Sequence, residues 1–238
     1  MNIPHICAEI TKQYLDYLGL DRCKPSRAFL NDLVRNHAYK IPWENFLLRE
    51  NGTLETDVEI LIHRITQEHL GGVCTQLNLC FAALLQSLGF SVTLHACMIH
   101  GFEDKPYETP RMTHLTPVVV CEHETLLAEI AWVGLANAMV MSDKTTQEIA
   151  HYRLNLNSNG NYVLQFLSHD QWFPQFEIFS HPLRMDEWLE CIDYSQPSAD
   201  RVAANHRVFI KVFPEGRVII KDNKITIVDG NIVNKIEI

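Results

Sequence analysis

The spacing of hydrophobic residues changes at Gly89, and this change limits the class of fold that the chain can adopt. Before Gly89, apolar side chains recur every three or four residues, as they do on one face of an α-helix. After Gly89, they gather in short runs that are rich in branched residues and separated by turn residues, which is typical of β-strands. Helices followed by strands predict an α+β fold.

Boundaries of the predicted elements follow from the same pattern. Helices are predicted around residues 10–18, 26–37, 56–65, 77–88 and 185–192. Strands are predicted at 91–99, 115–121, 126–131, 162–167, 172–179, 207–213, 217–221, 224–228 and 232–238. Thr56, followed three residues later by Glu59, has the pattern of a capping box and predicts the start of the third helix.

Composition excludes several classes of protein. The formal net charge of -9, without a cluster of Lys and Arg, argues against a nucleic-acid partner. Met1 to Lys12 lacks the pattern of a signal peptide, and no apolar run has the length of a membrane span, so we expect a cytoplasmic protein without a membrane partner. The seven cysteines include no C-x-x-C pair, so neither a disulfide framework nor a metal site is predicted.

One segment, Gly71 to Asn78, has the composition of a nucleophile site. Two glycines permit a tight turn, and Cys74 follows at the start of the helix whose apolar stripe begins at Leu77. A helix N-terminus favours the thiolate, which is the reactive form of cysteine. On this evidence alone, Cys74 is either a nucleophile or a small buried residue.

A thiolate nucleophile needs a base, and the base needs a group that orients it. His114 precedes a Val-rich run, so it is predicted at a strand end that faces a cleft. Glu129 lies in an apolar run, where an unpaired carboxylate is costly to bury. If the two strands form a hairpin, the imidazole and the carboxylate can meet. Taken singly, each residue also fits an ordinary surface position on a strand.

Five segments resemble, in chain order, motifs of the arylamine N-acetyltransferase family. Gly71 to Asn78 is similar to the signature R-G-G-x-C-x-E-x-N, and His37 to Asn45 resembles H-x-x-x-I-P-F-E-N. Thr113-His114 resembles the family's T-H, and Leu127 to Trp132 resembles L-x-D-V-G-F. Glu215 to Ile227 resembles a late D-G-R-V…L-T-I hairpin. Together these segments extend over nearly the whole chain.

The resemblance implies a fold and a division of the chain. The fold is a helical bundle, a central antiparallel β-barrel and a short strand-rich C-terminal lid, with a catalytic core like that of the cysteine proteases. The corresponding ranges are 1–89 for the bundle with the nucleophile, 90–195 for the barrel with the histidine and the acid, and 196–238 for the lid. Residues 195–200 correspond to a Ser-rich turn that lies near the coenzyme A phosphates in the family.

The resemblance also implies roles for residues. Cys74 becomes the nucleophile that accepts the acetyl group, His114 its base and Glu129 the third member of the triad, with Glu in place of the family's Asp. Substrate and cofactor contacts are expected at Gly72, Val73, Thr75, Phe102 and Trp132.

The implied reaction transfers an acetyl group from acetyl-CoA to an arylamine or arylhydrazine through a cysteine thioester, in a ping-pong mechanism without a metal. Leu70 and Gln76 depart from the Arg and Glu of the signature, and Ala131 and Val133 replace glycines of the loop after the acid. Four readings therefore stay open: this transferase, one with another acyl donor or an amide-forming acceptor, a hydrolase with the same triad, and a catalytically silent relative.

Overall fold

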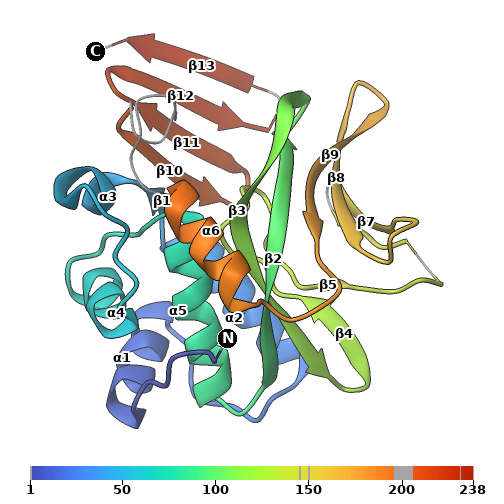
Figure 1. Ribbon diagram of the computed structural model, residues 1–238. Helices are drawn as coiled ribbons and strands as arrows, with labels where there is room; N and C mark the ends of the chain where they lie inside the picture. Colours follow the sequence, from blue (N-terminus) through green and yellow to red (C-terminus); the bar gives the residue numbers. More distant parts are fainter. Residues whose placement is uncertain (1, 145, 150, 196–205, 231, 238) are drawn as a thin grey trace.

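Helices precede strands in the structure, as the spacing of apolar residues predicts. The computed structural model describes residues 2–144, 146–149, 151–195, 206–230 and 232–237. The helices are α1 (Ala8–Leu18), α2 (Arg27–Lys40), α3 (Phe46–Asn51), α4 (Val58–Gln67), α5 (Cys74–Ser87) and α6 (Met185–Ser195). The α+β fold is confirmed, with the first five helices gathered into a bundle (Figure 1). No helix in these ranges is long and apolar enough to cross a membrane.

Helix α5 lies at the centre of the bundle. Its residues from Thr75 to Leu85 are all buried, and α1, α2 and α4 pack around it with their apolar faces. A helix surrounded in this way needs apolar residues on every side, which explains why α5 reads as hydrophobic all round.

The start of α4 differs from the prediction by one residue. The N-cap is Asp57, whose carboxylate accepts hydrogen bonds from the backbone N–H groups of Glu59 (2.9 Å) and Ile60 (3.3 Å). The capping box at Thr56 was therefore wrong. A carboxylate one residue further along also complements the positive end of the helix dipole, which a neutral hydroxyl does less well.

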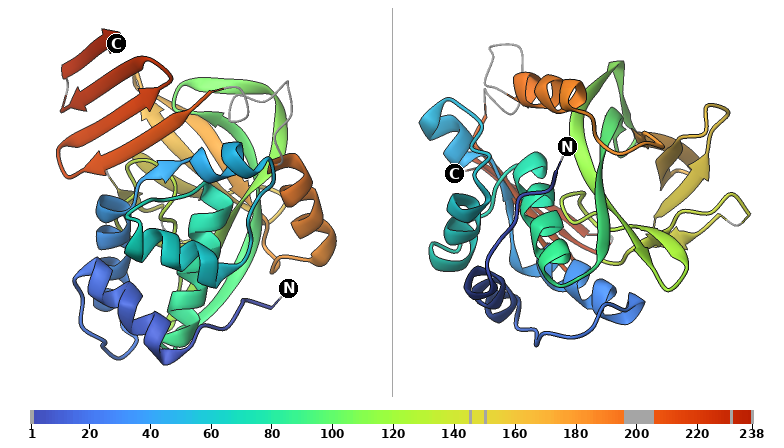
Figure 2. Two further views of the ribbon diagram at one scale, coloured as in Figure 1. Left: turned by 90° about the vertical axis from the view of Figure 1, so that its left-hand side faces the viewer. Right: turned by 60° about the horizontal axis from the view of Figure 1, so that its bottom comes forward.

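The predicted barrel is a curved antiparallel sheet of eight strands that is nearly closed (Figures 1 and 2). At its centre lie β2 (Ser91–Phe102) and β3 (Lys105–Cys121). The strand order is β5-β4-β3-β2-β9-β8-β7-β6. The other strands are β4 (Glu124–Leu127), β5 (Met139–Val140), β6 (Glu148–Ile149), β7 (Tyr152–Leu156), β8 (Tyr162–Ser168) and β9 (Gln171–Ile178).

Strand β4 is shorter than predicted. It ends at Leu127, and after Ala128 donates to the carbonyl of Pro117 at 2.9 Å, the backbone leaves the ladder. The expected continuation to Ala131 was wrong, because the N–H of Ala131 bonds to the side chain of Glu129 and not to a neighbouring strand.

The C-terminal strands form a second sheet of five strands, in the order β1-β10-β11-β12-β13. It contains β10 (Val208–Phe213), β11 (Gly216–Lys221), β12 (Lys224–Asp229), β13 (Ile232–Glu237) and, from the helical part, β1 (Trp43–Glu44). Trp43 pairs with Ile210, and Arg217 forms an ion pair with Glu103 at the tip of the β2–β3 hairpin. The sheet therefore bonds both to the 1–89 range and to the barrel, and the predicted boundary at 196 lies outside the described residues.

Candidate active site

Cys74 is the first residue of α5, and its side chain is half-buried. Gln76 fixes this turn: its Oε1 accepts from the N–H of Val73 at 3.0 Å, and its Nε2 donates to the carbonyl of Glu55 at 3.1 Å. The first backbone bond within the helix runs from Leu77 N–H to the carbonyl of Val73 (3.0 Å). The N–H groups of Cys74 and the residue after it therefore have no acceptor within the helix.

The two glycines before Cys74 bring the chain against β1. The carbonyl of Gly72 accepts from the N–H of Glu44 at 3.0 Å, and Gly72 forms a bridge with Trp43. At Gly71, an added Cβ would lie 1.8 Å from the carbonyl oxygen of Pro42. Glycine is required there because no side chain fits between the two backbones.

Gly71→Ala is expected to lower the free energy of unfolding by about 3 kcal/mol, since the backbone must shift to relieve the contact with Pro42. The control is Gly52→Ala, where φ is 68° and no atom lies within 4 Å of the added Cβ; there we expect only the backbone cost of about 1 kcal/mol. Urea unfolding measures both. An equal loss in the two variants would contradict the close-approach argument.

His114 lies at a bulge in β3. Cys97 pairs with His114, but the next partner of β2 is Met112, so Thr113 is an extra residue in the ladder. The carbonyl oxygen of Thr113 is 3.9 Å from Cys74 Sγ. The expectation of a strand end was wrong: His114 is inside a long strand and fully buried, and the bulge sets the direction of its side chain.

Glu129 is held by four hydrogen bonds just beyond β4. Its Oε2 is 2.8 Å from His114 Nε2, and its Oε1 accepts from the N–H of Ala131 at 2.7 Å. Asn78 Nδ2 is 3.0 and 3.2 Å from the two carboxylate oxygens. The carboxylate, 1% exposed, is thus paired and satisfied, as a buried charge must be. His114 Nδ1 is buried and forms no hydrogen bond, which leaves it free to serve a thiol.

The charges of the site shift two pKa values in opposite directions. Burial lowers the pKa of His114, but the negative charges of Glu129 and Cys74 outweigh burial and raise it to about 10. Burial raises the pKa of Glu129, but the His114 charge and the hydrogen bonds from His114 and Asn78 outweigh burial and leave this pKa below its ordinary value. Both shifts favour an imidazolium paired with a carboxylate at neutral pH.

Glu129→Gln is expected to cost stability in a pH-dependent way. The lowered pKa of Glu129 stabilises the fold above the ordinary glutamate pKa of about 4.3, and this contribution is lost as the pH falls. The raised pKa of His114 stabilises it below the ordinary histidine pKa of about 6.5, and this contribution is lost as the pH rises through about 10. The difference in unfolding free energy between wild type and variant should therefore be widest between these two ordinary values.

Urea unfolding at a series of pH values measures that difference. The control is Asp16→Asn, which removes an exposed carboxylate paired with Lys12 at 2.5 Å and should show little difference at any pH. A difference for Glu129→Gln that does not vary with pH would contradict the shifted pKa values.

Aromatic rings cover the imidazole. The ring centroid of His114 lies 5.6 Å from Trp132 and 5.0 Å from Phe176, and the rings of Trp132 and Phe102 are 5.7 Å apart. Two of the residues expected to contact substrate, Trp132 and Phe102, therefore pack together, and Trp132 meets the His114 ring edge to face. Thr75, which was also expected to contact substrate, lies outside this aromatic group. Its side chain is buried against Cys191 of α6, with 3.8 Å between Oγ1 and Sγ.

Two contributors were not predicted as such. Asn78 orients the carboxylate, and it lies one helical turn after Cys74, so the (i, i+4) spacing was a usable signal that both face β3. Glu44 is fully buried and paired with Arg64, with 3.0 Å between Oε1 and Nη2. Only the I-P-W-E-N resemblance pointed to Glu44, and nothing in the sequence pointed to its partner.

Comparison with known proteins identifies the family to which the chain belongs. Residues 28–238 match the N-acetyltransferase family. The chain is 26% identical over 168 residues to the arylamine N-acetyltransferase / N-hydroxyarylamine O-acetyltransferase of Salmonella typhimurium, covering 69% of this chain and 58% of that protein. It is 23% identical over 156 residues to the pineal gland isozyme NAT-3 of Gallus gallus, covering 63% and 53%. The match thus spans a little over half of the length of these curated relatives.

Solved structures extend the likeness to the whole fold. The arylamine N-acetyltransferase of Salmonella typhimurium superimposes with a TM-score of 0.86 at 21% identity, over 98% of this chain and 86% of that one. An enzyme of the same kind from Bacillus cereus, described as revealing a unique Cys-His-Glu catalytic triad, gives 0.84 at 17% identity, over 98% and 93%. The family match and the shared fold define the class of protein as an N-acetyltransferase. The chain belongs to the arylamine N-acetyltransferase family, as a divergent member.

Proposed function

We propose that this protein transfers an acetyl group from acetyl-CoA to a small aromatic amine or hydrazine through a thioester on Cys74. One observation carries the proposal: the sulfur of a half-buried cysteine at a helix N-terminus lies 3.9 Å from the carbonyl oxygen of Thr113, and the next residue is the fully buried His114, whose Nε2 is 2.8 Å from Glu129. The roles assigned to the three residues are cysteine nucleophile, base and orienting acid.

The first half-reaction loads the enzyme. The Cys74 thiolate attacks the thioester carbonyl of acetyl-CoA, the bond from carbon to the coenzyme A sulfur breaks, and the His114 imidazolium supplies the proton that the leaving thiolate takes up. The N–H groups at the first turn of α5, those of Cys74 and Thr75, are suited to bind the oxyanion because they have no acceptor within the helix. The exchange of one thioester for another needs no outside energy source.

The second half-reaction releases the product. The amine nitrogen attacks the Cys74 thioester, neutral His114 takes its proton through Nδ1, and the thiolate leaves as the amide forms. Glu129 keeps Nε2 protonated throughout, so that Nδ1 is the nitrogen that exchanges protons with the substrates. The pair ends as thiolate and imidazolium, ready for another acetyl-CoA.

A small apolar cavity lies beside the loop that follows Glu129. Its volume is about 20 Å³, and it is lined by α2, α5, β10 and the loop from Ile130 to Gly134. This volume holds about one water molecule, so an aromatic acceptor needs side chains such as Trp132 or Val133 to move. We place the acceptor ring against Trp132 and Phe102, and the coenzyme A thioester along the backbone at Gly72 and Val73.

Loading of the enzyme tests the proposal directly. Cys7 and Cys23 are exposed, so they are first replaced by serine to leave Cys74 as the one thiol among the seven that is not buried. The protein is incubated with acetyl-CoA, digested, and the Cys74 peptide examined by mass spectrometry for one added acetyl group. An arylhydrazine should then remove the group and yield the acetylhydrazide.

The outcomes separate the competing readings. Loading from another acyl-CoA but not from acetyl-CoA would replace the donor and keep the mechanism. Loss of the acetyl group to water as fast as to the hydrazine would indicate a hydrolase. A Cys74 that stays unmodified with every acyl-CoA would overturn the proposal in favour of a silent relative.

A further inference from the structure

Helix α6 packs against the turn that carries Cys74. Cys191 lies against Thr75, as described above, and Ile192 packs on the small apolar cluster that contains Val73. Val73 and Thr75 are the two neighbours of Cys74 in the chain. The position of α6 therefore bears directly on the backbone that aims the thiol.

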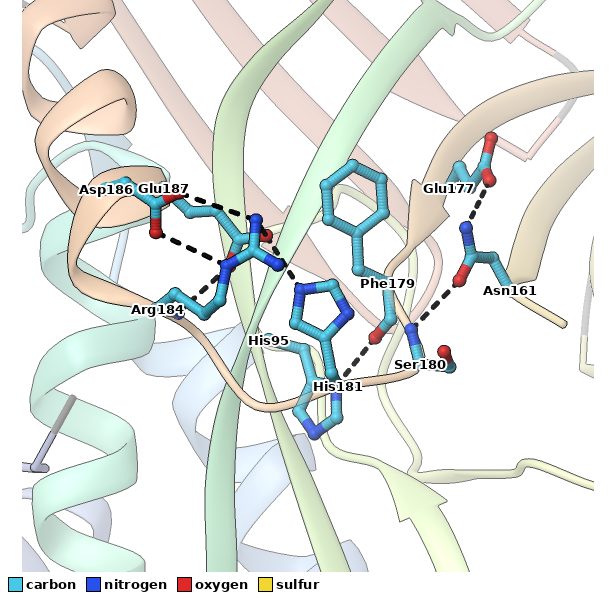
Figure 3. Close-up of polar contacts among 9 residues, drawn as sticks. All are labelled: His95, Asn161, Glu177, Phe179, Ser180, His181, Arg184, Asp186 and Glu187. Carbon is cyan, nitrogen blue, oxygen red and sulfur yellow. Dashed lines mark hydrogen bonds and ion pairs between the residues drawn. The ribbon is translucent and has the colours of Figure 1, made fainter. Parts of the chain in front are cut away.

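The beginning of α6 is fixed by one buried carboxylate, that of Glu187 (Figure 3). Its Oε1 is 2.8 Å from His181 Nε2, and its Oε2 accepts from the N–H of Arg184 at 2.9 Å. The Arg184 guanidinium adds an ion pair at 3.2 Å. Glu187 is 3% exposed, so these partners are needed to offset the cost of burying its carboxylate. The bond back to Arg184 is the half of a capping box that a glutamate supplies.

The segment before α6 is bonded to the barrel. Its backbone follows β2, because Phe179 N–H donates to Ala96 (3.1 Å) and Leu183 N–H donates to Leu94 (2.7 Å). The Phe179 carbonyl is also 2.7 Å from His95 Nδ1 (Figure 3). On the far side, Asn161 Oδ1 accepts from Ser180 N–H at 3.0 Å.

This anchoring links the two halves of the proposed triad. The strand that holds the segment, β2, pairs with β3 at Cys97 and His114. The helix that the segment begins, α6, packs on Thr75 and on the apolar cluster of Leu48, Leu54 and Val73, which includes the other neighbour of Cys74. The placement of α6 therefore bears on the position of the thiol relative to the imidazole.

We propose that Glu187 is a positioning residue: by fixing the start of α6 through His181 and Arg184, it holds the Cys74 turn in the orientation that presents the thiol to His114. Glu187 acts through α6 and does not itself touch the reacting atoms. The catalytic part of this inference rests on the proposed function, whereas the orientation of the thiol can be measured without it.

Glu187→Gln tests the inference in the background with Cys7 and Cys23 replaced by serine. The neutral amide cannot replace the carboxylate, because its NH2 group must face either the Arg184 N–H or the Arg184 guanidinium, and both are donors. We expect the rate constant for carbamidomethylation of Cys74 by iodoacetamide to fall about tenfold, since small displacements of a reacting group have large effects. We expect kcat for acetyl transfer, calculated per molecule whose Cys74 can be acetylated, to fall in parallel. The KM for acetyl-CoA should be nearly unchanged.

Asp186→Asn is the matched control. Asp186 precedes Glu187, is exposed and contacts the Arg184 side chain at 3.3 Å. Its replacement by Asn therefore removes one carboxylate charge, as Glu187→Gln does, but at the neighbouring position. Its alkylation rate should equal that of the parent. A merely structural role for Glu187 would lower the melting temperature and the yield but leave the rate constant per folded molecule unchanged, and that result would overturn the inference.

Two further variants keep the test decisive. If Glu187→Gln does not fold, His181→Gln takes its place, because the His181 ring is 42% exposed and its loss removes only one of the partners; an unchanged alkylation rate there would also overturn the inference. Ile192→Ala loosens the packing of α6 on the cluster that contains Val73 and should slow alkylation as well. If Glu187→Gln slows alkylation but the parent never accepts an acetyl group, the proposed function fails while the positioning role of Glu187 stands.

Discussion

Cys74→Ala is expected to reduce acetyl transfer by at least about 10⁴-fold, because the proposed mechanism has no path that avoids the thioester. Stability should change by less than about 1 kcal/mol, since the side chain is only half-buried. Hydrazine-dependent consumption of acetyl-CoA measures the first effect and urea unfolding the second. Both measurements are needed. If the variant is folded but does not turn over, the loss of acetyl transfer is due to the missing sulfur.

Cys23→Ala is the control for that experiment. Cys23 is exposed and lies before α2, so its replacement should alter neither transfer nor stability. Turnover near the wild-type rate in Cys74→Ala would remove the nucleophile from the mechanism, whatever the other variants show. A comparable loss in both variants would indicate that the assay responds to thiols in general.

Local patterns predicted most of the fold. The helices α1, α2, α4 and α5 follow from apolar periodicity, and the hairpins from β10 to β13 follow from the turn residues between them. These signals are local, because a stripe or a turn is set by residues that are neighbours in the chain. The short α3, β1, β5, β6 and β7 were not predicted, because so few residues carry no clear periodic pattern.

The site shows the same division between local and distant causes. Cys74 at a helix start was predicted from two glycines and the stripe that follows, and the structure agrees. The pairing of His114 with Glu129 agrees with the β3–β4 hairpin that the strand runs suggested. The bulge at Thr113 was not predictable, because it is a mismatch between two strands and leaves no mark in either one alone. The same holds for the ion pair of Arg64 with Glu44, because only the tertiary fold brings these two residues together.

Replacing His114 with glutamine is the second change with a large expected effect. Without the imidazole to take up the thiol proton, carbamidomethylation of Cys74 at neutral pH should slow by about 10²-fold. Acetyl transfer should fall further, by about 10³-fold or more, because proton transfer to the leaving group is lost as well. The control His100→Gln removes a barrel histidine that pairs with Glu177 at 3.4 Å, and it should leave Cys74 reactivity unchanged.

The same variant should also destabilise the protein, and this effect must be separated from reactivity. His114→Gln leaves the fully buried Glu129 charge without its partner, which costs about 3–5 kcal/mol. Adding Glu129→Gln removes that charge, so the double variant should regain much of the stability while Cys74 stays slow to react. Stability follows the satisfaction of the carboxylate, whereas reactivity follows the presence of the imidazole. A double variant that recovers both together would mean that His114 maintains the fold and does not activate the thiol.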